Sequence, residues 1–294
     1  MTRRVFRSGV IVGLLAMLTV PVAAKAQSNG KIVFERGSGF WVMEPDGTNP
    51  TRIDNEFLVR PNNRDPVWSP DGTQIAFGSD TGTTTTPQIY VMNADGTNLV
   101  SLTNDTVGMV EPAWSPDGTK IAVASNRDGI SSIYTIDADG SNIMRVTNAV
   151  PASDQAPAWS PDGTRIAFWT NEGAIGLHIA IVNADGTGRT GLWPNTAYGL
   201  NPAWSPDGTR IAYGNPRIVV MNTDGTNQTI LSSSGDRPAW SPDGTQIAFE
   251  RNVAGQVQIF VINADGTGET NLTGTAGGSA PDWQNLLLLS PAQR

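Results

Sequence analysis

The sequence predicts an all-β fold, a six-bladed β-propeller of four-stranded antiparallel blades, and three features of the chain predict it. A Trp-Ser-Pro-Asp-Gly pentapeptide recurs, a second turn signature follows each copy, and each chain end carries only part of a repeat. Self-similarity at a period of about 45 residues is typical of propeller blades. Because one blade is a single sheet, blades must stack around an axis to cover both of their faces.

The pentapeptide marks the end of the first, innermost strand of each blade. In Ser-Pro-Asp-Gly, Pro presets φ, Asp tolerates the next position and Gly takes a left-handed angle, so the segment predicts a type I turn. We expect its Asp residues to shape the turn and not to form a carboxylate array; they are Asp71, Asp117, Asp162, Asp207 and Asp243. The pentapeptide begins at Trp68, Trp114, Trp159, Trp204 and Trp240, and a degenerate copy supplies Trp283.

The second and third strands of each blade follow this turn. The second strand is Ile-Ala-Phe or a close variant, and the third resembles Ile89-Tyr90-Val91-Met92, which ends in an Asn-Ala-Asp-Gly turn. These runs are apolar on successive residues, so we expect strands that are covered on both faces. A short fourth strand, such as residues 99–102, completes the blade. The second-strand copies begin at Ile32, Ile75, Ile121, Ile166, Ile211 and Ile247.

The two chain ends predict how the ring closes. The N-terminal repeat has strands near Ile32, Trp41 and Arg52 but no first strand, whereas the C-terminal end has only the strand at Trp283. One blade is therefore expected to combine both ends, which removes the open sheet edge. The predicted propeller domain is 27–294. The segment Leu286–Leu289 either extends the closing strand or caps the channel.

Residues 1–26 are predicted to be a signal peptide. Arg3, Arg4 and Arg7 precede an apolar run, and Ala24 and Ala26 supply the small residues of a cleavage site after Ala26. The apolar run is shorter than the about 20 residues of a membrane span. We therefore expect no stable membrane insertion, and a periplasmic or extracellular location. The arginine pair also fits the twin-arginine route, and the sequence does not separate that route from general secretion.

The charge of the expected mature chain limits its partners. Residues 27–294 carry 15 basic and 27 acidic residues, a net charge of −12. Binding to phosphate backbones depends on clustered Lys and Arg, so nucleic acid is excluded as a partner. The charge favours a basic protein partner or a cation. Cysteine is absent, so no disulfide is expected, and we expect a monomer.

The repeat resembles a known family. The pattern Pro-x-Trp-Ser-Pro-Asp-Gly, Ile-Ala-Phe, Ile-Tyr-Val-Met-Asn-Ala-Asp-Gly-Thr covers residues 31–284 and resembles the WD40-like (PD40) repeats of TolB-like propeller proteins. The resemblance implies a non-enzymatic, exported propeller that binds or scaffolds proteins of the bacterial cell envelope. TolB has a separate α/β domain before its propeller. Because the first blade here starts at Lys31, we expect that domain to be absent.

One ring of variable positions is the candidate site. Three residues before each Trp, at the expected mouth of the central channel, lie Asp65, Glu111, Ala156, Asn201, Arg237 and Ala280. Asp65, Glu111 and Asn201 offer oxygen ligands to Ca²⁺, the one cofactor considered, and the resemblance also implies that such channels can hold a cation. Arg237 would repel a cation, and a salt bridge to Asp65 or Asp236 is the alternative. Arg237 and Trp193 are the candidate partner-binding residues.

Other functions remain as alternatives. A polysaccharide lyase or hydrolase would draw its acid–base groups from Asp65, Glu111, Asp154 and Asp236, and a cation or small-ligand sensor would use the same channel mouth. No catalytic residue is assigned. His178 is the only histidine, which with no cysteine excludes the usual zinc ligand sets; we expect it at the surface or a blade edge. We expect residues 137–142 to form a hairpin turn and not a calcium loop. Trp41 and Trp169 lie outside the repeated Trp position, so they either make exposed contacts or pack in the core.

Overall fold

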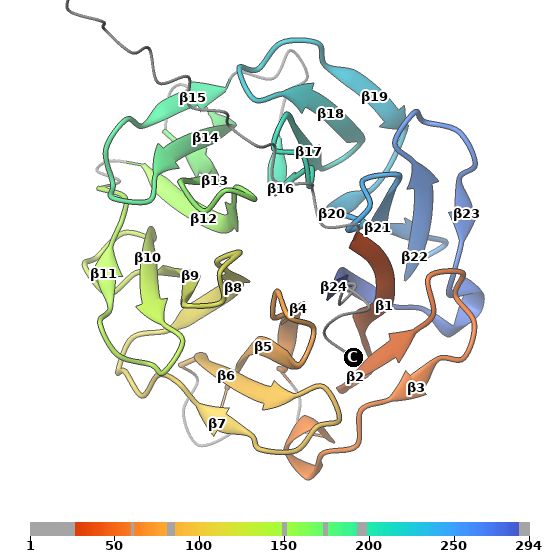
Figure 1. The fold of residues 1–294 in the computed structure, drawn as a ribbon, viewed down its shortest axis with the longest axis horizontal. Coiled ribbons are helices and arrows are strands. Elements are labelled where there is room, and N and C mark those ends of the chain that lie inside the picture. Colours follow the sequence, from red (N-terminus) through yellow and green to blue (C-terminus); the bar gives the residue numbers. More distant parts are fainter. Residues whose placement is uncertain are drawn as a thin grey trace, which may run out of the picture.

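Six four-stranded antiparallel sheets stand around a central axis (Figure 1). The computed structural model describes residues 27–59, 62–80, 86–148, 152–172, 176–192 and 199–287. The predicted six-bladed propeller is confirmed, with four strands in every blade. The predicted signal peptide lies outside the described residues. Across the described part of the chain, no helix is long and apolar enough to cross a membrane.

The strands run outward from the channel in each blade. Blade 1 consists of β24 (Ser279–Leu287), β1 (Gln27–Arg36), β2 (Gly39–Met43) and β3 (Thr51–Arg52). Blade 2 consists of β4 (Arg64–Trp68), β5 (Gln74–Ser79), β6 (Gln88–Asn93) and β7 (Val100–Ser101). Blade 3 consists of β8 (Met109–Trp114), β9 (Lys120–Ser125), β10 (Ser132–Asp137) and β11 (Met144–Arg145).

The remaining blades follow the same order. Blade 4 consists of β12 (Ser153–Trp159), β13 (Arg165–Asn171), β14 (Leu177–Asn183) and β15 (Thr190–Leu192). Blade 5 consists of β16 (Leu200–Trp204), β17 (Arg210–Gly214), β18 (Ile218–Asn222) and β19 (Thr229–Ser232). Blade 6 consists of β20 (Asp236–Trp240), β21 (Gln246–Val253), β22 (Gln256–Asn263) and β23 (Thr270–Asn271). Within the described residues, two short 3₁₀ helices, η1 (Glu56–Val59) and η3 (Gly274–Ala276), lie in connections between blades.

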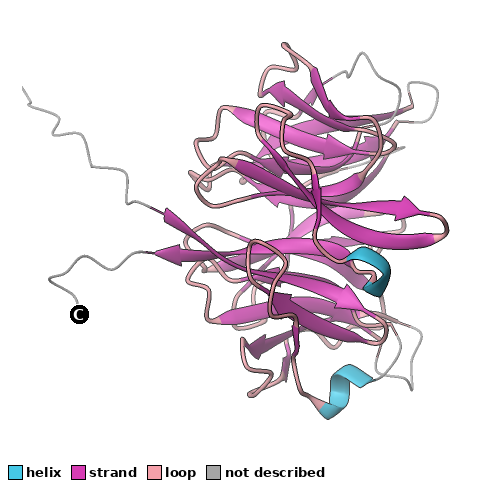
Figure 2. Cartoon of the chain, turned by 90° about the vertical axis from the view of Figure 1, so that its right-hand side faces the viewer, coloured by secondary structure: helices cyan, strands magenta, loops and turns pink. Residues whose placement is uncertain are grey.

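Blade 1 joins the two ends of the chain, as predicted. In it β24 pairs with β1 in antiparallel register, with Trp283 opposite Ile32. The pair continues as far as Leu287 opposite Gln27 and projects beyond the other blades (Figure 2). The C-terminal segment therefore extends the closing strand through Leu287, and residues 288–289 lie outside the described part.

Side chains of this projecting pair reach the turns of both neighbouring blades. The Nδ2 of Asn29 donates to Asp243 at 2.9 Å, in the blade 6 turn. On the other side, the Nε2 of Gln284 donates to the carbonyl of Gly72 at 2.8 Å, in the blade 2 turn. The closing strands are thus tied to the ring by side chains as well as by packing.

The Ser-Pro-Asp-Gly segments form the predicted turns. In blade 2 the Ser69 amide donates to the Gln74 carbonyl, and Gly72 has φ +70°. One oxygen of Asp71 accepts hydrogen bonds from the Ser69 hydroxyl at 2.6 Å and from both the amide and the hydroxyl of Thr73. The same three bonds recur in the turns of blades 3–6. The repeated Asp residues therefore have the turn-forming role that was expected.

The hydrophobic core lies between blades. Trp68 packs with Val33 and Phe40 of blade 1 and with Ile75 of its own blade. Trp283 packs likewise with Ala248 of blade 6, so each repeat Trp fills the angle between two sheets. Burial of a Trp removes a large apolar area from water, which makes this contact a major source of stability. Trp41 and Trp169 lie half-buried against such clusters, which confirms core packing for them.

His178 is buried, with 1% of its surface exposed, so its predicted position at the surface or a blade edge was wrong. It lies near the start of β14. At equivalent positions, the side chain of Gln88 donates to the Asp105 carbonyl at 2.9 Å, and that of Gln258 accepts from Asn271 at 2.6 Å. This position therefore faces the outer part of its own blade and not solvent.

We expect replacement of Trp283 to test the closure. The substitution Trp283→Ala should lower the free energy of unfolding by about 3–5 kcal/mol, because it leaves a cavity between blades 1 and 6. Chemical denaturation followed by circular dichroism measures this change. Leu286→Ala, on the same strand but 41% exposed, is the control and should change stability by less than about 0.5 kcal/mol. Equal losses in the two variants would contradict the role assigned to closure.

Candidate functional site at the channel mouth

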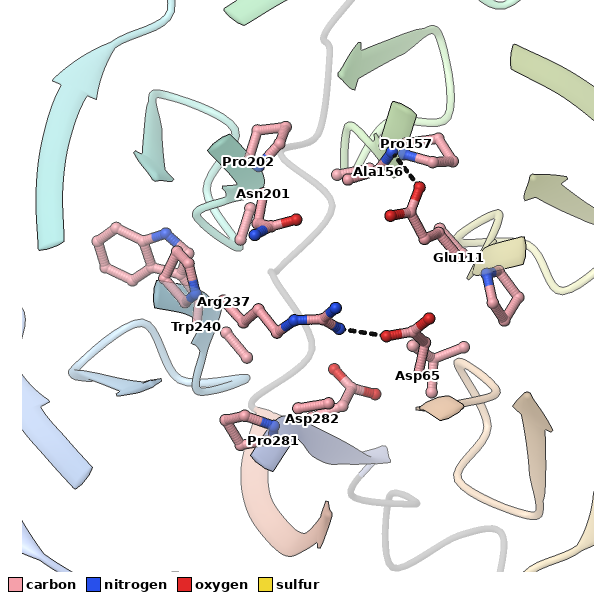
Figure 3. A pocket seen from close by; sticks show the side chains of 18 of the residues that line it. Asp65, Glu111, Ala156, Pro157, Asn201, Pro202, Arg237, Trp240, Pro281 and Asp282 are labelled. Atoms are coloured by element: carbon pink, nitrogen blue, oxygen red, sulfur yellow. Dashed lines mark hydrogen bonds and ion pairs between the residues drawn. The ribbon is translucent and has the colours of Figure 1, made fainter. Parts of the chain in front are cut away.

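The six predicted ring positions share one backbone feature. Each lies at a bulge of its innermost strand and has a left-handed φ between +48° and +56°: Asp65, Glu111, Ala156, Asn201, Arg237 and Ala280. In blade 2 the register to the next strand shifts between Arg64 and Val67, and every other blade has the corresponding shift. A bulge re-aims the side chain of the extra residue, and here side chains of the ring point into the channel (Figure 3).

An ion pair crosses the mouth. The guanidinium of Arg237, from blade 6, binds the carboxylate of Asp65, from blade 2 (Figure 3). A second carboxylate, that of Glu250, lies 3.9 Å from the Nε of Arg237. Asn201 donates to Asp236 at 2.8 Å. The predicted alternative, a salt bridge from Arg237 to Asp65, is therefore confirmed.

Carboxylates satisfy the amides that the bulges leave unpaired. Glu35 accepts from the amide of Asp65 at 2.6 Å, and Glu250 accepts from that of Ala280 at 2.8 Å. Glu111 accepts from the amide of Ala156 at 2.8 Å. In each case the carboxylate comes from the preceding blade, so these bonds also join blades. An unpaired buried amide would cost about 1–3 kcal/mol, which gives these three acids a structural role.

The crowding of acids changes their protonation. Burial, followed by the charge of Asp65, raises the pKa of Glu111 to about 7. The same two causes raise the pKa of Glu35, and burial raises that of Glu250. Burial alone would lower the pKa of Arg237, but the charges of Asp65 and Glu250 raise it, so the guanidinium stays protonated. At neutral pH the mouth therefore holds a fixed cation and a Glu111 that is partly neutral.

Beneath the ring, the residues that line the channel are mostly apolar. The cavity has a volume of about 310 Å³. A proline follows each bulge residue, and its missing amide leaves no donor at that point of the free strand edge. The next layer consists of Ala or Val in five blades and Asp282 in blade 1. The prolines are Pro66, Pro112, Pro157, Pro202, Pro238 and Pro281.

Asp282 is the one acid in this lower layer. Its Oδ2 accepts from the amide of Trp68 at 2.7 Å, across the contact between blades 1 and 2. Burial raises its pKa to about 7. Sequence reasoning missed Asp282, together with Glu35 and Glu250. A signal was available, because each is an acid at a repeat position that carries a small or apolar residue in other blades.

The predicted site residues have different outcomes. Asp65, Glu111 and Asn201 all line the cavity, but each is held by the partner described above. No group of three or more acidic or histidine side chains within the described ranges has metal-site geometry, and a cation at this ring stays a prediction. Arg237 lines the mouth, whereas Trp193 lies outside the described residues.

Asp154 does not belong to the mouth, so its predicted place there was wrong. It is fully buried and forms an ion pair with Arg189 at 2.9 Å. Arg189 also contacts Glu172 at 2.9 Å, so a network internal to blade 4 holds Asp154 away from the channel. The 137–142 segment is a turn, as expected, since Asp139 accepts from both the amide and the hydroxyl of Ser141.

Part of the chain is similar to a known family of propellers. Residues 171–285 match the family described as the TolB beta propeller domain (PD40). No curated protein matches the sequence. Among solved structures, TolB from Acinetobacter baumannii matches with a TM-score of 0.73 at 20% identity, over 86% of this chain and 66% of that chain.

Two further structures show how widely the fold is used. A putative TolB from Agrobacterium tumefaciens matches with a TM-score of 0.70 at 18% identity, over 90% of this chain and 100% of that chain. Hydrazine synthase from Kuenenia stuttgartiensis matches with a TM-score of 0.71 at 14% identity, over 89% of this chain and 47% of that chain. At these identities the likeness shows the fold alone, and one of the matched proteins is an enzyme.

The raised pKa of Glu111 predicts a pH effect on stability. A carboxyl group whose pKa is higher in the folded than in the unfolded chain binds extra protons when folded, so stability falls as pH rises between about 4.5 and 7. Glu111→Gln should remove its share of this fall, on the order of 2–3 kcal/mol between pH 4.5 and pH 8. Denaturant unfolding at both pH values measures the difference.

A second acid provides the control. Hydrogen bonds from Arg251 lower the pKa of Glu269, so its contribution changes below pH 4.5 and outside the measured window. Glu269→Gln should therefore leave the pH dependence between pH 4.5 and pH 8 as it is. The same fall in the wild type and in Glu111→Gln would refute the assignment of a raised pKa to Glu111.

Proposed function

We propose that the whole propeller, of which residues 171–285 match the family described as the TolB beta propeller domain, is a protein-interaction module of the bacterial cell envelope. The same repeat builds all six blades, from Lys31 to Trp283. A protein partner would insert a segment into the channel mouth. The ring would select that segment, and the closed set of blades would hold the ring rigid.

The observation that carries this proposal is that hydrogen bonds and an ion pair hold the charged side chains at the mouth in fixed positions. Glu35, Glu111 and Glu250 each accept a hydrogen bond from a backbone amide. Asp65 forms an ion pair with Arg237. Groups fixed in this way present a preformed surface, which lowers the entropic cost of binding. The cavity at the mouth, with mostly apolar walls and a volume of about 310 Å³, has room for one or two side chains of a partner.

The charge of the chain supports the choice of partner. Residues 27–294 carry a net charge of −12, and acids outnumber the single arginine at the mouth. Opposite charge steers association and sets its salt dependence. We therefore expect the inserted segment to be basic or mixed in charge, and its binding to weaken as ionic strength rises.

One observation favours a second function. Glu111, with a pKa raised to about 7, has the acidity that suits a general acid or base at neutral pH. A lyase or hydrolase acting on a polysaccharide could use it at the cavity. Turnover of a glycan by the purified chain, abolished in Glu111→Gln but not in Glu269→Gln, would favour that function over binding.

A channel-blocking variant tests the interaction. Glu111 and Arg237 show that the ring conformation accepts long side chains, so Ala156→Arg should fold normally while it fills part of the mouth. After cross-linking in the envelope of the source bacterium, the variant should recover roughly tenfold less of a stoichiometric partner than the wild type does. Quantitative mass spectrometry measures the ratio.

The matched control adds the same side chain elsewhere. Thr229 lies exposed on β19, the outermost strand of blade 5, so Thr229→Arg should recover as much partner as the wild type. If Ala156→Arg retains the partner equally well, the channel mouth is not the binding surface. If no stoichiometric partner is found with the wild type, the proposal of an interaction module itself fails.

Export is part of the same proposal. We expect the chain purified from the envelope to begin at Gln27, because peptidase cleavage after Ala26 would remove the basic and apolar segment. Intact-mass measurement of the native protein gives the N-terminus directly. Substitution of Ala24 and Ala26 by Asp should block cleavage and leave a heavier, membrane-associated precursor. A native protein that retains residues 1–26 in a cytoplasmic extract would overturn this expectation.

A further inference from the structure

A groove between blades 3 and 4 differs from the two grooves that follow it in the ring, between blades 4 and 5 and between blades 5 and 6. It holds a cavity of about 330 Å³, separate from the channel mouth. Trp159, which is only partly buried, is one of its lining residues. Carboxylates of three turns surround it, and Met144, 60% exposed, lies among the lining residues. The carboxylates are those of Asp117, Asp162 and Asp185.

The next two grooves show how the chain fills this position elsewhere. Between blades 4 and 5, the guanidinium of Arg165 lies 4.8 Å from the ring centre of Trp204. Between blades 5 and 6, the guanidinium of Arg210 lies 4.7 Å from the ring centre of Trp240. Trp204 and Trp240 are only 8% and 7% exposed. In both grooves a cation stacked on the aromatic face completes the packing.

Blade 3 has a cation at the same repeat position, but it is paired with a carboxylate and does not stack on the indole. Lys120 stands where Arg165 and Arg210 stand in their blades, directly before the Ile-Ala segment. Its Nζ binds the carboxylate of Asp137 at 2.5 Å. Within the described residues, no guanidinium or ammonium group stacks on Trp159. The indole of Trp159 therefore keeps a face on which no cation stacks, unlike the indoles of Trp204 and Trp240.

The electrostatics of the groove suit a cation. Hydrogen bonds from Ser160 and Thr164 hold the pKa of Asp162 at about 2, and the pKa values of Asp117 and Asp185 are lowered by the hydroxyl and amide groups of their own turns. All three carboxylates are therefore ionised at neutral pH. The two cationic residues of the lining are already paired, Lys120 with Asp137 and Arg145 with Asp128.

We propose that this groove binds the guanidinium of an arginine side chain from a protein partner, stacked on Trp159 between the turns of blades 3 and 4. The grooves between blades 4 and 5 and between blades 5 and 6 hold the same pairing within the chain itself. A planar guanidinium can lie on the indole while it donates to the carboxylates at the rim. The site depends on the groove alone and is independent of the function proposed for the channel mouth.

A peptide titration tests the proposal. The probe is acetyl-Gly-Arg-Gly-amide, and the readout is the indole N–H signal of Trp159 in ¹⁵N-labelled protein, assigned with Trp159→Phe. We expect this signal to shift in a saturable manner, and the indole signals of Trp204 and Trp240 to stay in place. The same peptide with citrulline, which has nearly the same shape but no charge, should bind roughly tenfold more weakly.

Two variants that the repeat itself tolerates provide the controls. Lys120→Arg places in blade 3 the residue that blades 4 and 5 already have, and it should close the site and weaken the peptide roughly tenfold. Arg165→Gln places in blade 4 the residue found at position 74 and position 246, and it should free the face of Trp204, so that its indole signal also shifts with the peptide. Thermal unfolding verifies that both variants fold.

The results that overturn the proposal are equally specific. An unmoved Trp159 signal at millimolar peptide would refute it. So would an equal shift with the citrulline peptide, or an unchanged affinity in a folded Lys120→Arg variant. None of these outcomes depends on whether a partner enters the channel mouth, so the two proposals can fail separately.

Discussion

The pairing of β1 with β24 is the contact on which the rest of the molecule depends. Without it, blade 1 would expose the inner edge of β1, and the ring would lack Ala280 and Asp282. Glu250 would lose the hydrogen bond that it accepts from the amide of Ala280, and the amide of Trp68 would lose its acceptor, the carboxylate of Asp282. Because every blade packs only on its two neighbours, a gap at one place would loosen the geometry of the entire channel mouth.

The mouth combines two requirements that usually conflict. Bulges turn side chains into the channel, but they also leave amides without strand partners. Acids from neighbouring blades resolve this problem, since each accepts one such amide and at the same time adds negative charge. Arg237 offsets part of that charge. Because these acids are buried close to one another, the pKa values of Glu35, Glu111 and Glu250 are still raised.

The fold could be predicted from the sequence because the repeat encodes it in local chemistry. Turn residues such as Asp71 and Gly72 act within a few positions, and the partial repeats at the two ends leave only one way to close the ring. The ring positions followed from the same alignment. Asp154 and His178 were misplaced because their surroundings come from the outer part of blade 4, which strand periodicity does not describe.

The ring of prolines that follows the bulges limits how a partner can be recognised. A polypeptide entering the channel meets strand edges interrupted by prolines in all six blades, so it cannot join any sheet as a fifth strand. In the proposed complex, the backbone of the partner would therefore contribute little to binding, and the side chains of the partner would determine which segment is bound. The channel would recognise the side chains of a partner and would not bind it by strand addition. The same prolines hinder self-association through the inner strand edges of the molecule.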